Sequence, residues 1–277
     1  MAAWKNTPPH EPVRGVVGRP ESASHYDLRR WEPGGATGRY VEYFWSVTWD
    51  LRGREPVEST VITYPSMHLS HEWGDDGVRH GYALPGTFVH GIVEEVFRTT
   101  IRDRGSVVGA RFRPGGFTAR FGGDASTMTG RVCPAGEVLG RPRKFDDDIE
   151  RASAELDRLI GRGDRDDTVY PPLRRLVDRI RDDDRVQRVE QVADLTPWSV
   201  RTTQRVFRRY VGVPVKWVLC RYRLQNAAWE IETDRDVDFA DLAVRLGWYD
   251  QAHFINDFRT LLGETPGTYA ARYGKRR

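Results

Sequence analysis

The sequence is poor in the residues that mark disulfide scaffolds, thiolate metal sites and membrane proteins. Only two cysteines, Cys133 and Cys220, occur in 277 residues, and they lie too far apart for a metal-ligating pair. No apolar run approaches the roughly 20 residues that cross a bilayer. The N-terminus, MAAWKNTPPHEP, lacks the basic and then apolar pattern of a signal peptide. We therefore expect a cytoplasmic protein without a membrane partner.

Familiar enzyme motifs are also absent from the sequence. It contains no glycine-rich phosphate loop followed by Lys, no Gly-x-Ser-x-Gly elbow and no His-Glu-x-x-His helix. The acidic runs at Asp146–Asp148 and Asp182–Asp184 are typical of solvated helix ends. The sequence therefore predicts a protein that is not an enzyme and needs no cofactor.

Basic charge is present but unevenly distributed. The chain has 43 basic and 40 acidic residues, a net charge of +3, yet Trp198–Gln225 holds seven basic residues and no acid. Arg185–Arg277 carries 16 basic and 11 acidic residues, so the part before it is mildly acidic. A basic module beside an acidic one predicts that the C-terminal part binds a polyanion.

The pattern of apolar residues divides the chain into a β-rich part and a helical part. Residues 1–37, rich in Pro and Gly, predict an irregular arm. Within Arg39–Phe112, short β-branched and aromatic runs alternate with turn residues, which is typical of an antiparallel barrel or sandwich. Helical periodicity follows, and Gly161–Asp167 is typical of a linker. We expect an α+β protein with two domains, residues 1–165 and 166–277.

Two segments of the C-terminal part share one plan. Each has a short helix containing an Ala, a turn, a polar residue and a second helix with a Phe at a matching place. The polar residues are Ser199 and Asp250, and the phenylalanines are Phe207 and Phe258. A side-chain oxygen at a helix start can accept a hydrogen bond from the first turn. The sequence thus predicts two helix-turn-helix units.

The second helix of the first unit has an apolar face and a basic face. The apolar stripe comprises Val200, Thr203, Val206, Phe207 and Tyr210. The opposite face presents Arg201, Gln204, Arg205 and Arg208. An α-helix fits the DNA major groove, where Arg pairs with guanine and Gln with adenine. Arg208 and Arg209 are better placed for phosphates. We interpret the basic face as a DNA contact, although a merely solvated helix face has the same composition.

An amphipathic segment, Val215–Glu232, lies between the two units. Its 18 residues would form a helix about 27 Å long. That length is close to the roughly 34 Å of one DNA turn. The two units could therefore occupy successive major grooves on one face of a duplex.

Three stretches in this part carry a family pattern. They are VEQVADLTPWSVRTTQRVFRRYVG, RYRLQNAAWEI and DLAVRLGWYDQAHFINDFRTLLGETPGTYAAR, in which Leu-Gly-Trp, His-Phe, Asp-Phe-Arg and Gly-x-Thr-Pro occur in order. Arg188–Arg272 thereby resembles the DNA-binding domain of AraC/XylS-type transcription regulators. The resemblance implies two helix-turn-helix modules that share a central helix and bind promoter DNA.

The resemblance also implies which residues contact DNA bases. In the first unit these are Arg201, Gln204 and Arg205. In the second unit they are Gln251, Ala252, His253, Ile255 and Asn256. Our predicted DNA-binding set adds Ser199, Thr202, Arg208 and Arg209 from the first unit.

This chain departs from the family pattern at several positions. Thr203 stands where the family usually has Leu, Pro197 where the turn commonly has Gly, and Asn256 where Arg is frequent. Glu230–Glu264 contains nine acids and three bases. Because acidic groups repel phosphate, we expect the first unit to supply most of the affinity for DNA.

The N-terminal part carries a looser resemblance to the same family. GSVVGARFRPGGF and YVEYFWSVTWDL are similar to the β-domain of a subgroup of these regulators. The resemblance implies a cupin-like antiparallel β-barrel with accessory helices, used for effector sensing, dimerisation or both. Aromatic residues and a histidine are candidates for lining a pocket for an apolar or planar molecule, namely Trp45, Trp49, Tyr64, His68 and Trp73. Ordinary core packing explains the same residues.

Four histidines of this part, His68, His71, His80 and His90, raise the question of a zinc, iron or manganese site. His68 and His71 differ by three positions, which places them on opposite faces of one strand. No carboxylate completes an obvious ligand set. We predict no metal site, and we expect the thiol of Cys133 to be inert.

These observations predict a sequence-specific bacterial transcription regulator whose N-terminal domain modulates DNA binding. The expected partners are promoter DNA, a small-molecule effector, RNA polymerase and a second copy of the chain. The alternative is a cupin-type metal-dependent enzyme with an appended helical module, which stoichiometric metal in the protein would favour. In a third interpretation, the same helices bind damaged DNA or a protein without sequence preference.

Overall fold

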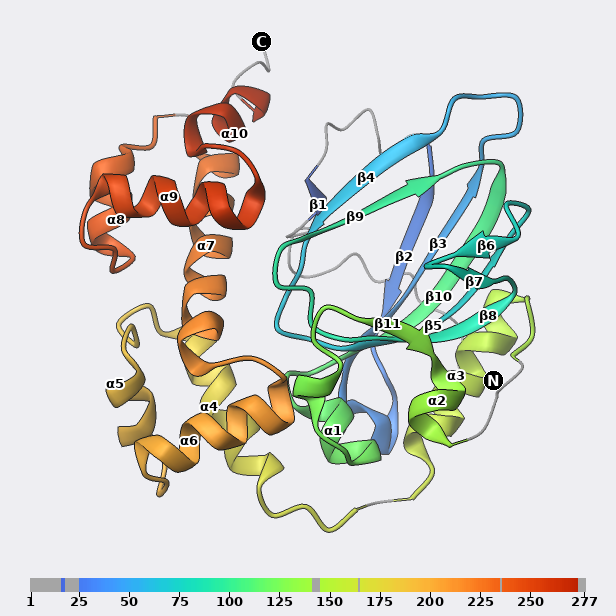
Figure 1. Ribbon diagram of the computed structural model, residues 1–277, viewed down its shortest axis with the longest axis horizontal. Coiled ribbons are helices and arrows are strands. Elements are labelled where there is room, and N and C mark those ends of the chain that lie inside the picture. Colours follow the sequence, from blue (N-terminus) through green and yellow to red (C-terminus); the bar gives the residue numbers. More distant parts are fainter. Residues whose placement is uncertain (1–15, 18–24, 141–144, 164, 235, 274–277) are drawn as a thin grey trace.

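The computed structural model describes residues 16–17, 25–140, 145–163, 165–234 and 236–273. A β-rich part lies beside a helical part that is built along one long helix (Figure 1). Short strands joined by tight turns form the β-rich part, as the sequence predicts. The strands are β1 (Val16–Val17), β2 (Asp27–Trp31), β3 (Val41–Asp50), β4 (Val57–Ile62), β5 (His68–Gly74), β6 (Val78–Arg79), β7 (Tyr82–Ala83), β8 (Gly86–His90), β9 (Val96–Ile101), β10 (Arg104–Phe112) and β11 (Val132–Pro134).

The strands form two main antiparallel sheets and a small ribbon. The larger sheet has the order β11-β8-β5-β10-β3-β2, the smaller one has the order β1-β4-β9, and β6 pairs with β7. Among the described strands, no hydrogen-bonded pairing joins the two main sheets. The predicted antiparallel β-domain is therefore present, with its barrel open into two facing sheets.

The prediction of an irregular arm over residues 1–37 is wrong in part. Asp27–Trp31 forms the edge strand β2 of the larger sheet, and Val16–Val17 pairs with β4. Residues 1–15 and 18–24 of the predicted arm lie outside the described residues. The strand was missed because Arg30 occupies an inward position, where its guanidinium lies 4.9 Å from the centre of the Tyr43 ring. An inward Arg hides the alternation that marks a strand.

Helices cover one end of the sheets and form the whole C-terminal part (Figure 1). They are α1 (Gly116–Phe121), α2 (Ala135–Leu139), α3 (Ile149–Gly161), α4 (Tyr170–Asp182), α5 (Val189–Asp194), α6 (Val200–Val206), α7 (Val215–Thr233), α8 (Phe239–Arg245), α9 (Gln251–Leu262) and α10 (Pro266–Tyr273). Helix α6 runs on into a π-helical turn, η4 (Phe207–Val211). Two short 3-10 helices, η2 (Gly35–Arg39) and η3 (Ala125–Thr127), complete the fold.

A pair of glycines, Gly115 and Gly116, follows the end of β10. Gly115 caps α1 with a φ of +80°, a backbone conformation that residues with a Cβ adopt only under strain. A Cβ on Gly116 would lie 2.3 Å from the carbonyl oxygen of Tyr40. Both glycines are therefore required where α1 packs against the start of β3.

One hydrophobic core runs from the larger sheet into the first helix-turn-helix unit. Phe112 of β10, Leu173 of α4, Phe207 of η4 and Val218 of α7 are all members of it. The second unit has its own core, which Ile62 and Val96 of the smaller sheet join. Burial thus ties both units to the β-rich part, and the domain boundary at residues 165 and 166 stays a prediction. Within the described residues, no helix is long and apolar enough to cross a membrane.

Candidate functional site

Two helix-turn-helix units lie at opposite ends of α7 (Figure 1). Helices α5 and α6 with η4 form the first unit, and α8 and α9 form the second. Helix α7 spans 19 residues, within one residue of the predicted segment, and is therefore about 28 Å long. This arrangement matches the predicted plan of two modules on a shared central helix.

Both predicted caps fix the starts of the second helices. The Ser199 hydroxyl oxygen accepts a hydrogen bond from the Thr202 backbone N–H at 3.2 Å. The Asp250 carboxylate accepts one from the His253 backbone N–H at 2.7 Å. Because a cap sets where a helix begins, it also sets which side chains share a face. The two caps therefore orient α6 and α9.

Helix α6 and the turn η4 that follows it bury the predicted apolar stripe, except at its first position. Thr203, Val206, Phe207 and Tyr210 are buried, whereas Val200, next to the cap, is 38% exposed. The predicted DNA-contacting side chains on the other face are exposed, namely Ser199, Arg201, Gln204, Arg205, Arg208 and Arg209, while Thr202 is half-buried.

The arginines of this face are not neutralised by the chain itself. Among the described residues, none forms an ion pair with Arg201, Arg205 or Arg208. The Arg209 guanidinium lies 5.9 Å from the centre of the adjacent Tyr210 ring. An exposed row of guanidinium groups without carboxylate partners attracts phosphate at long range. The first unit therefore has the electrostatic character of a DNA-contacting surface.

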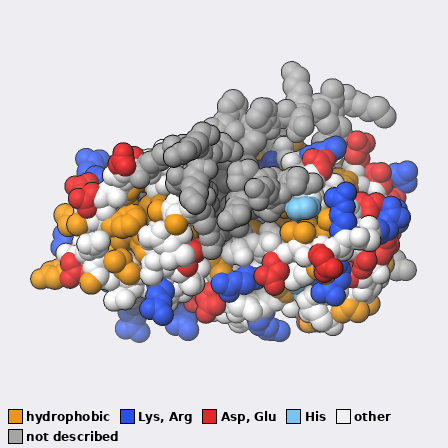
Figure 2. Space-filling model, turned by 90° about the horizontal axis from the view of Figure 1, so that it is seen from above, with side chains coloured by type: hydrophobic (Ala, Val, Ile, Leu, Met, Phe, Trp, Pro, Cys, Tyr) orange, Lys and Arg blue, Asp and Glu red, His pale blue; other side chains and the backbone are white. Residues whose placement is uncertain are grey.

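Helix α9 presents a less basic face. Of its predicted contacts, Gln251, Ala252, His253 and Asn256 are exposed and Ile255 is half-buried. The His253 imidazole lies 3.5 Å from the Asp257 carboxylate. On preceding elements, Arg245 is ion-paired with Glu230 and Asp241. Acidic and basic side chains are mixed over the face of the molecule seen in Figure 2. The ion pairs of the second unit make its surface less basic than that of the first unit.

An exposed aromatic residue of the second unit was missed from the sequence. Tyr249 is 90% exposed and directly precedes the cap Asp250. Trp198 has the equivalent place before Ser199 in the first unit and is half-buried. The repeat of the two helix-turn-helix units in the sequence could have revealed Tyr249, because it aligns Tyr249 with Trp198. A tyrosine hydroxyl at this turn can donate a hydrogen bond to a phosphate.

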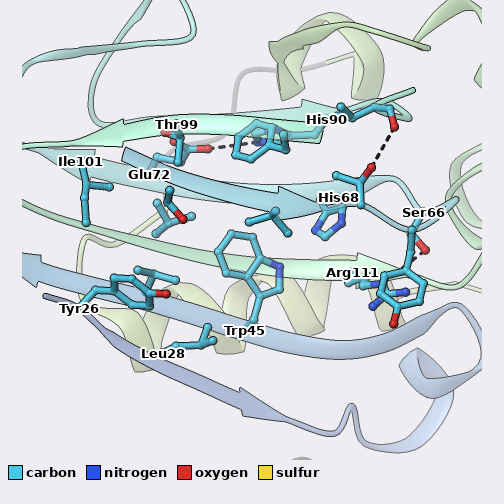
Figure 3. Close-up of a pocket in the computed structure, with 18 of the residues that line it drawn as sticks. Tyr26, Leu28, Trp45, Ser66, His68, Glu72, His90, Thr99, Ile101 and Arg111 are labelled. Atoms are coloured by element: carbon cyan, nitrogen blue, oxygen red, sulfur yellow. Dashed lines mark hydrogen bonds and ion pairs between the residues drawn. The ribbon is translucent and has the colours of Figure 1, made fainter. Parts of the chain in front are cut away.

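A cavity of about 230 Å³ lies between the two sheets of the β-rich part. Trp45 points into it, with Arg111 and Ser66 toward one end and Ile101 toward the other (Figure 3). Four of the predicted pocket residues, Trp45, Trp49, Tyr64 and His68, line this cavity. The fifth predicted residue does not.

Trp73 is absent from the cavity wall because it follows Glu72 on β5. Successive strand residues point to opposite faces, and Glu72 points inward. The Trp73 ring instead stacks under the Arg104 guanidinium, 4.9 Å away. The aromatic cluster predicted from the sequence thus contains one residue from the wrong face.

Two glycines of β10 make room for the indoles. Gly105 pairs with Trp49 and Gly109 with Trp45 across the β10–β3 ladder. A Cβ on Gly109 would lie 2.8 Å from the Trp45 ring, and one on Gly105 would lie 2.4 Å from the Trp49 ring. Because Gly105 and Gly109 have no side chains, the indole rings of Trp49 and Trp45 can lie over β10 and line the cavity.

At the polar end of the cavity, the positive charge of Arg111 is paired with the negative charge of Glu42. Burial acts to lower the pKa of the Arg111 guanidinium, but Glu42, 3.2 Å away, and the Tyr43 hydroxyl raise it above its usual range. The Arg111 guanidinium also lies 3.8 Å from the centre of the Tyr64 ring. Burial, assisted by Arg111, holds the pKa of His68 well below its ordinary value, so this imidazole is neutral.

The histidines separate into two groups, as the strand geometry predicts. His71 points away from the cavity and lies 3.1 Å from the Thr87 hydroxyl and 3.2 Å from the Asp147 carboxylate. His80 and His90 meet at the cavity wall, where Glu72 lies between them. The prediction that no carboxylate completes a set is therefore wrong. Glu72 was missed because strand pairing, and not sequence spacing, brings it to His80 and His90.

The wall of the cavity is bonded directly to α7. The Gln225 amide donates to the carbonyl oxygen of Thr63 at 3.0 Å, and Thr63 lines the cavity. The Arg221 guanidinium donates to the carbonyl oxygens of Glu94 at 2.5 Å and Glu95 at 3.2 Å. The helix that carries both units is thus held by the segment that closes the cavity, a connection for which the sequence offers no signal.

Two capped second helices with exposed faces, joined by one long helix, are the geometry of the DNA-binding helix-turn-helix class. The model of a helix-turn-helix domain family matches residues 192–272, and that of a domain of unknown function (DUF6597) matches residues 29–134. Residues 192–272 of the chain therefore form a helix-turn-helix domain. The resemblance found in the sequence is confirmed.

Individual relatives are similar over parts of the chain. The transcriptional activator AarP of Providencia stuartii is 32% identical over 81 residues, which span 29% of this chain and 57% of AarP. The DNA-binding domain of AdpA, in complex with a target DNA, is 26% identical, with 39% of this chain and 93% of that domain covered and a TM-score of 0.33. ToxT from Vibrio cholerae is 10% identical over 89% of this chain and 97% of ToxT, with a TM-score of 0.39.

Proposed function

We propose that this protein is a sequence-specific transcription regulator that binds promoter DNA through α6 and α9. The observation that carries the proposal is the exposed guanidinium face of α6, which has no carboxylate partner among the described residues. The helix-turn-helix family match and the similarity to the activator AarP support it. An α-helix with free Arg and Gln side chains is suited to reading base edges in the major groove.

The two units contribute unequally in this proposal. Arg201, Gln204 and Arg205 read bases, while Arg208 and Arg209 hold phosphates. The second unit adds contacts from Gln251, Ala252, His253, Ile255 and Asn256, and Tyr249 adds a phosphate contact. Ion pairs such as that of Arg245 with Glu230 neutralise much of the basic charge of the second unit. The first unit therefore supplies most of the affinity, and the second extends the recognised site by about one helical turn.

The cavity of the β-rich part is the proposed effector site. Its walls are largely aromatic and aliphatic, with Trp45, Leu28 and Phe97 among them. A dry cavity of about 150 Å³ is large enough to hold benzene, so a volume of about 230 Å³ suits a small planar or apolar molecule. Trp45 and Trp49 would stack on such a ligand.

Contacts between the cavity wall and α7 supply a route for regulation. Thr63 donates from its hydroxyl to the carbonyl oxygen of Val93 at 2.9 Å, and both residues line the cavity. Gln225 and Arg221 of α7 bind this same segment. The Tyr64 ring contacts Tyr222 of α7, with ring centres 6.4 Å apart. A ligand that displaces the wall would therefore shift α7 and change how the two units are presented to DNA.

Selection of bound fragments from genomic DNA by the purified full chain tests the proposed function. We expect enrichment of one site with two half-motifs about one helical turn apart. The same selection with an Arg205→Ala chain is expected to lose the enrichment, and with an Arg54→Ala chain to keep it, because Arg54 is exposed in the β-rich part. Fragments bound without sequence preference would contradict the proposal and favour a non-specific nucleic-acid or protein partner.

A further inference from the structure

Three potential metal ligands converge at the inner wall of the cavity. The Glu72 carboxylate, the His80 imidazole and the His90 imidazole each offer one atom, and these atoms all lie within 4.8 Å of one another. His90 Nε2 is 3.1 Å from Glu72 Oε1, and His80 Nε2 is 3.2 Å from the same oxygen. Ligands that share one zinc ion at about 2.0–2.2 Å lie about 3.0–3.6 Å from each other. Each imidazole nitrogen is thus already at this spacing from the carboxylate.

The fold assembles this cluster from three separate segments. Strands β5 and β8 pair so that Glu72 lies opposite Gly86 and His90 opposite His68. Because side chains alternate along β5, Glu72 points to the same side as His68, into the cavity. His80 comes from the turn between β6 and β7 and has a φ of +53°, which is uncommon for a residue other than glycine. The turn therefore holds its imidazole against Glu72 and His90 at a cost in backbone strain.

The surroundings favour a bound cation. Glu72 is 2% exposed. Arg79 contacts Glu72 at 3.3 Å but also contacts Asp76 at 3.2 Å, so the two carboxylates and one guanidinium sum to one negative charge. Ser70 donates to Glu72 Oε1 at 2.8 Å and steadies the carboxylate. Supporting hydrogen bonds of this kind orient the ligands of protein metal sites.

We propose that Glu72, His80 and His90 bind a divalent first-row transition metal, with an open coordination position toward the cavity. Two imidazoles and one carboxylate suit zinc, iron or manganese, and three protein ligands leave a position for water or another oxygen or nitrogen donor. All three residues line the cavity, so this position faces the space in which an effector would lie. A metal ion would anchor a polar group of a ligand whose apolar body packs on Trp45. We assign no reaction to the site.

A purely structural role predicts a different behaviour of the same residues. In the hydrogen-bonded cluster, each imidazole can donate its Nε2–H to Glu72. Binding of zinc through Nε2 moves each of these protons to Nδ1 and replaces the hydrogen bonds to Glu72 with zinc–nitrogen bonds. A network that only stabilises the fold would bind zinc weakly and would keep these hydrogen bonds in its presence.

Zinc titration of the metal-free full chain tests the proposal. We expect one Zn²⁺ per chain by elemental analysis after gel filtration, and a calorimetric titration with a stoichiometry of one. Glu72→Gln keeps the shape of the side chain, and His80→Asn suits the positive φ because Asn tolerates that conformation. Each is expected to weaken zinc affinity by more than tenfold. His68→Gln is the matched control, since His68 lines the same cavity outside the cluster, and its affinity should stay unchanged.

Three results would overturn the proposal. One is a wild-type chain that retains less than one equivalent of zinc. Another is wild-type zinc affinity in either Glu72→Gln or His80→Asn. The last is an equal loss in His68→Gln. A circular-dichroism spectrum of each variant checks that it is folded, and the visible spectrum of Co²⁺ bound to the wild-type chain gives a separate readout of nitrogen and oxygen ligation. None of these readouts depends on DNA binding.

Discussion

The guanidinium of Arg221, in α7, donates a hydrogen bond to the carbonyl oxygen of Glu95, 3.2 Å away, across 126 positions of sequence. Arg221 is fully buried, its guanidinium lies 4.6 Å from the centre of the Trp217 ring, and no described carboxylate forms an ion pair with it. Burial lowers its pKa to about 10, so the side chain remains charged at neutral pH. A buried charge without an ion-pair partner costs free energy. Its position at the contact between the cavity segment and the DNA-binding part is consistent with a role in coupling them.

Replacing Arg221 with Met should loosen the cavity segment. Loss of hydrogen bonds from a charged group weakens local structure by about 1.5–3 kcal/mol, which corresponds to an increase of roughly ten- to a hundredfold in amide exchange. We expect faster hydrogen exchange in residues 91–95, measured by mass spectrometry. Arg223→Met is the matched control, because Arg223 donates to Gly247 within the C-terminal part at 2.8 Å. Equal exchange of residues 91–95 in both variants would argue against coupling through Arg221.

Gly109→Ala should push the Trp45 indole out of place. The added Cβ would lie 2.8 Å from the ring, and overpacking of this kind typically destabilises by about 1–3 kcal/mol. Urea unfolding followed by tryptophan fluorescence measures the loss. Gly34→Ala serves as the control, since nothing lies within 4 Å of the added Cβ and φ is −86° there. An unchanged free energy of unfolding in Gly109→Ala would mean that the cavity wall can yield.

Thr203→Val should stabilise the protein. The Thr203 side chain is fully buried, and its hydroxyl has no hydrogen-bond partner among the described residues. Valine has nearly the same shape and removes the unsatisfied group, so we expect a gain of about 1 kcal/mol in the free energy of unfolding. Thermal or urea unfolding checks this, and DNA affinity should stay the same because Thr203 is turned away from the exposed face. A loss of stability would indicate that the hydroxyl has a partner, such as a buried water.

Cys220 should react slowly with iodoacetamide at neutral pH. Burial and the nearby Asp257 carboxylate raise the pKa of its thiol to about 11. Only the thiolate reacts, so the rate should increase with pH up to that value. Asp257→Asn removes the negative charge, lowers the pKa and should speed alkylation at pH 8, by about tenfold for each unit of change. The measurement is made in a Cys133→Ala background, and an unchanged rate would mean that burial alone controls the thiol.

The helical part could be predicted closely from the sequence because its signals are local. The caps Ser199 and Asp250 and the stripe through Phe207 lie within one helical turn of what they determine. The bounds of α7 and the exposed face of α6 follow from spacing alone. Val200 is the exception: it follows the cap directly and is 38% exposed, although it lies on the predicted apolar stripe.

The β-rich part was less predictable because strand register is a long-range property. Trp73 and Glu72 are neighbours in sequence, but only the pairing of β5 with β8 and β10 decides which of them points into the cavity. The same pairing brings Glu72 to His90, 18 residues away. The bond from Gln225 to Thr63 spans 162 positions and has no motif. These contacts include the proposed metal site and the route from the cavity to α7.

The difference between the two units gives a further prediction. Asn256→Ala should weaken specific DNA binding by no more than a few tenths of a kcal/mol, because α9 lies in a mixed electrostatic setting. Arg205→Ala should cost about 1–3 kcal/mol, as expected for an arginine that reads a guanine edge. Equal losses in the two variants would contradict the unequal roles of α6 and α9.

Fluorescence anisotropy with the selected site at fixed salt tests the central claim, that the arginine face of α6 contacts DNA, most directly. The wild-type chain, Arg205→Ala and Arg54→Ala are titrated against the specific site and against unrelated DNA. We predict that Arg205→Ala weakens binding to the specific site by about 5- to 150-fold, while Arg54→Ala binds as the wild type does. Unchanged affinity in Arg205→Ala would contradict the claim.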